Sequence, residues 1–172
     1  MRNVDEQDLK HLAAAVELAR EGLEAGDEPF GSVLVTGDDE VLRQDRNRVA
    51  AGDNTRHPEL ALAQWAANNM SGDARALATV YTSGEHCPMC SAAHGWVGLG
   101  RIVYASSSRQ LSGWLAEWGA PPSPVRPLPV QEVAPRVAVE GPEPELAEEV
   151  RKLQMEMWRR RGLPIGGPGT TT

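Results

Sequence analysis

The sequence has few cysteines, few aromatic residues and no long apolar run. Its two cysteines, Cys87 and Cys90, are too few for a disulfide scaffold, and a lone C-x-x-C pair indicates a reducing compartment with a metal or redox role. No apolar run approaches the roughly 20 residues of a membrane span. The first ten residues, MRNVDEQDLK, contain no apolar signal core. We therefore expect a cytoplasmic protein with no membrane partner.

Basic residues are outnumbered as well. The 17 lysines and arginines face 24 aspartates and glutamates, which gives a net charge of −7 at pH 7. A general nucleic-acid binder usually has the opposite balance, because phosphate contacts require Lys and Arg. The one basic cluster lies on the last predicted helix, where bases near a helix end are ordinary partners of the helix dipole. We therefore predict no nucleic-acid partner.

The composition, 41% hydrophobic and 24% charged over 172 residues, is that of one soluble globular domain. We place this domain at residues 1–161 and expect residues 162–172 to form a mobile tail. The segment 120–129 holds five prolines and is expected to be extended. Apolar periodicity and turn residues predict an α/β protein with helices at 8–23, 58–69, 88–95, 111–118 and 143–161, and strands at 30–35, from 41, at 78–82, 101–105 and 136–140.

Two short motifs carry the chemistry. The first is His57-Pro58-Glu59 at a loop-to-helix junction, and the second is Cys87-Pro88-Met89-Cys90 at the start of another helix. One imidazole and two thiolates are protein ligands that zinc prefers, and three of them leave a fourth tetrahedral position for water. Glu59 is two residues from His57, close enough to exchange a proton with that water without binding the metal. The pattern therefore predicts a catalytic zinc site.

Two other interpretations of the cysteine pair remain open. The pair could be a redox centre, although such a centre needs neither His57 nor Glu59. It could also belong to a purely structural zinc site that takes its fourth ligand from His86 or His94, although such a site needs no free carboxylate.

The combined motifs resemble the cytidine-deaminase superfamily of zinc hydrolases, and within it the guanine and nucleobase deaminases. The resemblance covers Phe30 to Ala105 and departs from the family at His86, where a proline is usual. It rests on Pro29-Phe30-Gly31, Asn47, His57-x-Glu59 and Glu85-x-Cys87-Pro88-Met89-Cys90, in the family's order. It implies a three-layer α/β/α sandwich around a mixed five-stranded sheet, and a homodimer.

The resemblance also assigns roles to individual residues. It implies one zinc ion per chain, bound by His57, Cys87 and Cys90, and it gives the acid–base role to Glu59. It implies that Asn47 donates a hydrogen bond to the substrate ring or its carbonyl group.

The same resemblance also assigns positions to four aromatic residues. Trp96 and Phe30 correspond to residues beside the substrate, with core packing as the alternative for each. Trp114 and Trp118 fall where relatives form a lid or a subunit contact, and for them packing in the core or in a dimer is favoured over substrate contact.

Pro58 differs from the family pattern in a way that bears on the substrate. In relatives the residue between the histidine and the glutamate offers its backbone N–H to a substrate carbonyl, and proline has no N–H. We therefore expect a deaminase of a small aminated N-heterocycle, either a free base of the guanine or cytosine type or a related aminotriazine. The alternatives are a tRNA adenosine deaminase and a non-catalytic module stabilised by zinc.

Overall fold

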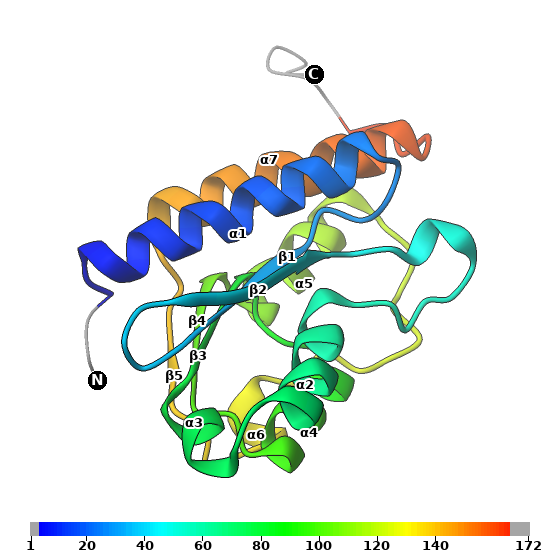
Figure 1. The fold of residues 1–172 in the computed structure, drawn as a ribbon. Coiled ribbons are helices and arrows are strands. Elements are labelled where there is room, and N and C mark those ends of the chain that lie inside the picture. The colour runs from blue at the N-terminus through cyan, green and yellow to red at the C-terminus, as the bar shows by residue number, and fades with distance from the viewer. Residues whose placement is uncertain (1–3, 166–172) are drawn as a thin grey trace.

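The computed structural model describes residues 4–165, which build one mixed sheet between layers of helices (Figure 1). The strand order is β2-β1-β3-β4-β5. The first three strands in this order pair antiparallel, and β3, β4 and β5 run parallel. The strands are β1 (Gly31–Val35), β2 (Val41–Arg46), β3 (Thr79–Gly84), β4 (Arg101–Ser106) and β5 (Val139–Glu140). The predicted three-layer fold with a five-stranded sheet is therefore confirmed.

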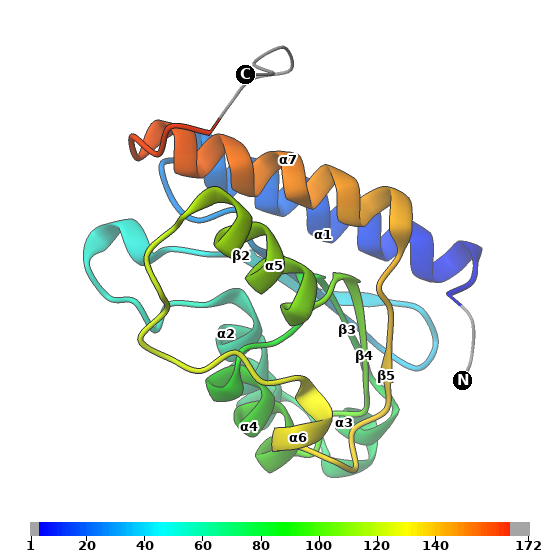
Figure 2. The ribbon, with the colours of Figure 1, turned by 180° about the vertical axis from the view of Figure 1, so that it is seen from behind.

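Alternation along the strands divides the core between the two faces of the sheet. Val33 and Tyr81 pack into one apolar cluster with α1 (Glu6–Glu24) and α7 (Pro144–Arg160). Leu34 and Val80 point the other way, into a cluster with α2 (Pro58–Asn69) and α4 (Pro88–Val97). Figure 2 shows α1 and α7 lying side by side along one face, away from α2 and α4.

Several boundaries differ from those predicted because side-chain caps set them. Asp5 and Ser107 form capping boxes, so the first helix and α5 (Ser108–Trp118) begin earlier than their apolar periodicity indicates. Two short helices, α3 (Gly72–Leu77) and α6 (Val130–Val133), were not predicted, since each is too short to show a periodic pattern. The fifth strand has only 2 residues, fewer than the predicted 136–140. A short 3-10 helix, η1, covers Val49–Ala51.

Two segments of the chain were predicted to lie outside regular helices and strands. The segment 120–129 forms neither helix nor strand, as its prolines predict. The predicted tail lies outside the described residues from position 166 onward, and before that the Leu163 amide donates to the Trp158 carbonyl, 3.0 Å away. The boundary at residue 161 thus stays a prediction. Within residues 4–165, no helix is both long and apolar enough to cross a membrane.

A buried ionic network ties the first helix to the parallel strands. Arg101 makes two bonds of 2.8 Å to Asp8 and two of 3.0 and 2.6 Å to Glu140, and the Tyr81 hydroxyl donates to Asp8 at 2.8 Å. Burial opposes the charge on Asp8, but the bonds from Arg101, the Asp5 amide and Tyr81 outweigh it and lower its pKa to about 2. Helix α1 therefore depends on an ionised Asp8.

Replacement of Arg101 by methionine should lower the free energy of unfolding by about 3–5 kcal/mol, because the buried Asp8 and the partly buried Glu140 would lose the cation they share. The Asp8 carboxyl has a lower pKa in the folded chain than its unfolded value of about 3.9, so its stabilisation is present above pH 4 and is lost as the pH falls toward 2. Urea unfolding between pH 7 and 2 measures both effects. Arg20→Met, which removes exposed ion pairs, should change stability by less than about 1 kcal/mol. Equal effects of the two variants would contradict this account.

Candidate active site

The three predicted metal ligands converge at the starts of two helices. His57 precedes α2, Cys87 precedes α4, and Cys90 lies in the first turn of α4. The Nδ1 atom of His57 is 3.5 Å from the Cys87 Sγ and 3.6 Å from the Cys90 Sγ, and all three atoms lie within 4.8 Å of one another. A tetrahedral zinc ion with bonds of about 2.3 Å to sulfur and 2.05 Å to nitrogen places such atoms about 3.6 Å apart. The donor set therefore fits zinc, and it leaves one coordination position open.

Local sequence explains why both helices begin at the site. Pro58 and Pro88 occupy the first helical position of α2 and α4, where the missing N–H costs no hydrogen bond. The positive end of a helix dipole stabilises a thiolate. Hydrogen bonds from Cys90 and His57 lower the pKa of the Cys87 thiol to about 4, against the effect of burial. The hydrogen bond that the His57 ring shares with Cys87 also raises the pKa of His57.

Glu59 is buried next to the ligands, with a relative exposure of 6%. Its Oε1 accepts hydrogen bonds from the Ser32 hydroxyl at 3.0 Å and the Thr82 hydroxyl at 2.9 Å. Burial raises the pKa of its carboxyl group, and the nearby charge of His57 lowers it in part. A carboxyl group with a raised pKa, two residues from a candidate metal ligand, is suited to accept a proton and release it.

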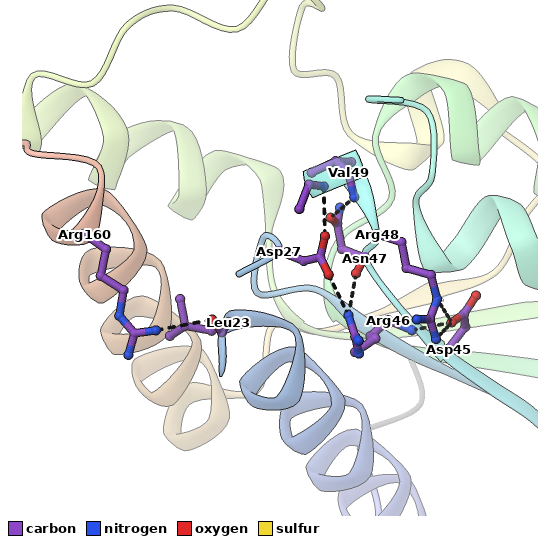
Figure 3. Close-up of polar contacts among 9 residues, drawn as sticks. Leu23, Asp27, Asp45, Arg46, Asn47, Arg48, Val49 and Arg160 are labelled. Carbon is purple, nitrogen blue, oxygen red and sulfur yellow. Dashed lines mark hydrogen bonds and ion pairs between the residues drawn. The ribbon is translucent and has the colours of Figure 1, made fainter. Parts of the chain in front are cut away.

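Asn47 presents an unpaired donor. Its side chain is 0% exposed, its Oδ1 accepts from the Val49 amide at 3.1 Å, and its Nδ2 has no hydrogen-bond partner in the described structure. Arg46 braces the loop by donating to the Asp27 carboxylate at 2.7 Å and to the Asn47 carbonyl at 3.1 Å (Figure 3). Since a buried unpaired amide is costly, the arrangement is explained if a ligand completes it.

A cavity of about 330 Å³ opens beside His57. It is lined by Asp45, Arg48, Asp53, Thr55, Arg56, His57, Leu60, Ala61 and Gln64. Its two arginines and two aspartates give it no single charge. The cavity therefore reaches one predicted metal ligand, His57, while Glu59 and Asn47 are buried and do not line it.

The predicted aromatic contacts lie in different surroundings. Phe30 packs across Gly84, where an added Cβ would lie 3.2 Å from the ring. Trp96 is 90% exposed, which excludes core packing within one chain. Trp114 packs against the cluster of α1 and α7, and its ring stacks on that of Trp118 with centroids 6.5 Å apart. A substrate role for Phe30, Trp96 and Pro58 stays a prediction.

His86 and His94 are not part of the metal cluster. Both are 1% exposed, and their rings meet edge to face with centroids 5.3 Å apart. The Nε2 atom of His94 lies 3.1 Å from the Gly100 carbonyl, and burial lowers the pKa of His94 to about 4. In the described part of the chain, the only group of three or more potential ligands is His57, Cys87 and Cys90.

Sequence reasoning missed two polar residues around the site, Ser32 and Thr82, and the structural role of a third, Glu85, which it named only as part of the cysteine motif. Ser32 and Thr82 contact Glu59 from the sheet. Glu85 accepts hydrogen bonds from the Ser108 amide at 2.8 Å and the Val130 amide at 2.9 Å, which ties the cysteine loop to the starts of α5 and α6. A signal for the two hydroxyls was present, because they interrupt otherwise apolar strands. Nothing local indicated the partners of Glu85, which are 23 and 45 residues away.

Comparisons with known proteins agree with this geometry. The chain is 34% identical over 110 residues to a protein of Schizosaccharomyces pombe described as a probable cytosine deaminase, covering 63% of this chain and 65% of that protein. It is 35% identical over 97 residues to a guanine deaminase of Bacillus subtilis, covering 55% of this chain and 62% of that protein. The chain thus spans slightly less than two thirds of the length of these two relatives.

Solved structures share the fold at lower sequence identity. A guanine deaminase from Nitrosomonas europaea superposes with a TM-score of 0.66 at 22% identity, over 91% of this chain and 86% of that one. A tRNA:A34 deaminase superposes with a TM-score of 0.59 at 23% identity, over 84% of this chain and 99% of that one. At these identities the likeness establishes the fold alone.

Replacement of Cys87 or Cys90 by alanine should remove zinc from the protein. The bound metal should fall from close to one ion per chain to near zero, because two remaining ligands hold zinc weakly and metal binding is coupled to local folding. Metal analysis after gel filtration measures this. Ser91→Ala, which removes a buried hydroxyl next to Cys90, is the matched control and should keep the metal. Full retention of zinc by either cysteine variant would refute the site.

The family model for the cytidine and deoxycytidylate deaminase zinc-binding region matches residues 5–106. This range contains both motifs, the four strands β1 to β4 and the two helices that carry the ligands. The zinc ligands His57, Cys87 and Cys90 thus lie within the matched region. The chain belongs to the cytidine and deoxycytidylate deaminase family of zinc-binding proteins.

Proposed function

We propose that this protein is a zinc-dependent hydrolase that deaminates a small aminated N-heterocycle. The observation that carries the proposal is the buried Glu59 carboxyl, which lies beside the three-ligand cluster but is not one of its members. A structural zinc site has no use for such a group. A proton-transferring residue is what hydrolysis of an amino group requires.

The reaction follows from the positions of these groups. His57, Cys87 and Cys90 would hold a zinc ion, which when bound would lower the pKa of a water molecule to about 7. Glu59 would take one proton from the attacking water as its oxygen bonds to the ring carbon bearing the amino group, and would pass that proton to the ring nitrogen. Glu59 would then take the second proton of the same oxygen and pass it to the departing amino nitrogen. The C–N bond breaks, ammonia leaves and a carbonyl group remains on the ring.

A free base is the favoured substrate class. Two of the sequence relatives are named for cytosine and guanine, and the chain's charge of −7 disfavours a polyanionic RNA. The Nδ2 atom of Asn47 is a buried donor available to a ring nitrogen or carbonyl. An aminotriazine offers the same aminated ring and belongs to the same class. Deamination of tRNA is the alternative.

A homodimer in a cytoplasmic location completes the proposal. The family resemblance implies the homodimer, and the exposed indole of Trp96 on α4 supports a subunit contact near the site.

A panel of compounds tests the function. The zinc-loaded protein should release ammonia from at least one of guanine, cytosine or an aminotriazine, and more slowly from nucleosides. Glu59→Gln should keep the metal and lose turnover by about 10²–10⁴-fold, because an amide cannot carry the proton. Activity of that variant within a few-fold of wild type would refute the mechanism. Inosine formation in a tRNA stem-loop at a comparable rate would favour the alternative substrate.

Pro58 tests which ring the site accepts. If the natural substrate places no carbonyl group at the start of α2, Pro58→Ala should selectively raise kcat/KM for guanine, because alanine restores one backbone N–H donor. We expect kcat/KM for guanine to rise a few-fold to about tenfold relative to the best substrate of the panel. This change corresponds to one hydrogen bond, which contributes about 0.5–1.5 kcal/mol. Pro88→Ala, at the same position of α4, should change both substrates equally. An equal change in Pro58→Ala would show that Pro58 only shapes the helix entry.

A further inference from the structure

Two buried hydroxyl groups lie directly beneath Glu59. Ser32 on β1 and Thr82 on β3 are opposite each other in the antiparallel ladder, and both are 0% exposed. They share the face of the sheet on which Leu34 and Val80 pack against α2 and α4. The apolar pattern of this face therefore gives way to hydroxyls at the end of the strands that meets the start of α2.

The hydroxyls and one carboxylate oxygen form a closed triangle. The Oε1 of Glu59 is 3.0 Å from the Ser32 Oγ and 2.9 Å from the Thr82 Oγ1, and the two hydroxyl oxygens are 2.9 Å apart. Thr82 also lies 2.9 Å from the Gly84 carbonyl. Both hydroxyls form their hydrogen bonds to Glu59 at Oε1. The triangle thus holds one carboxyl oxygen against the sheet and leaves the other for water or substrate.

The geometry points to Ser32 and Thr82 as positioning residues for Glu59, an inference that rests on the proposed function. A glutamate side chain has three rotatable bonds. The triangle restricts their rotation by fixing the Oε1 atom at the end of the side chain. Proton transfer requires donor and acceptor within about 2.6–3.2 Å, and small misplacements reduce rates strongly. The two strands thereby set the position at which the proton is exchanged.

Hydroxyl groups suit this position because each can donate a hydrogen bond to the carboxyl oxygen. Both can donate to Oε1 of Glu59, which stays an acceptor while the exchanged proton is held on the other carboxyl oxygen. Glu59 can therefore keep its place throughout a turnover.

Kinetics of matched variants test the inference. Thr82→Val, which keeps the shape, and Ser32→Ala should each lower kcat by about tenfold with KM within about twofold, and the double variant should lose more. Thr82→Ser should restore most of kcat. Ser106→Ala removes a buried serine hydroxyl of β4 that bonds only the Ser83 carbonyl, so it should keep wild-type kcat. Zinc content should stay at one ion per chain in all of them.

Crystal structures of the zinc-loaded variants provide a readout independent of turnover. In Thr82→Val and Ser32→Ala the Glu59 carboxyl should move by about 1 Å or occupy a second rotamer, and in Ser106→Ala it should stay in place. An unmoved Glu59 in the double variant, or an unchanged kcat, would overturn the inference. Wild-type protein that deaminates nothing in the panel would refute the proposed function, while the position of Glu59 would still decide the role of the hydroxyls.

Discussion

The site depends on two helices, α2 and α4, that begin beside each other on one face of the sheet. Each starts with a proline, and each is preceded by a metal ligand, so their packing brings His57 within 3.6 Å of both sulfur atoms. The positive ends of both helix dipoles then surround the thiolates. Any change in how these helices pack would separate the ligands, whatever the sequence of either motif.

Burial of a carboxyl group beside this cluster is the second constraint. Desolvation disfavours the charge on Glu59, and the nearby charge of His57 and the hydrogen bond from Thr82 on β3 compensate in part. The Ser32 and Thr82 hydroxyls both bond one oxygen of this carboxyl group. Their placement depends on Gly31, because a Cβ there would lie 2.4 Å from the Ala15 carbonyl of α1. The first helix can therefore approach β1 closely at the residue before Ser32. Helix α1, the sheet and the start of α2 together determine where the Glu59 carboxyl group lies.

The loop after β2 is organised by charge. The buried Asp27 carboxylate binds the Arg46 guanidinium on one oxygen and the Ala50 amide on the other (Figure 3). This bracing holds the Asn47 amide in an otherwise unfavourable, unpaired state. Glu85 plays a comparable part on the opposite side, where it joins the cysteine loop to α5 and α6. Rigid supports on both sides are what a site needs if it is to distinguish rings that differ by one donor or acceptor.

The sequence by itself determined the main helices and strands, since apolar periodicity, prolines at helix starts and turn residues act over a few positions. It also indicated the group of His57, Cys87 and Cys90 that could hold zinc, because the two motifs carry the ligand types and spacing that zinc requires. Only the tertiary structure decided which polar residues meet across the sheet: Ser32 and Thr82 are 50 residues apart, and Asp8 and Arg101 are 93 apart. Local patterns report that such residues are buried, but their partners depend on strand order and register, which non-local packing sets.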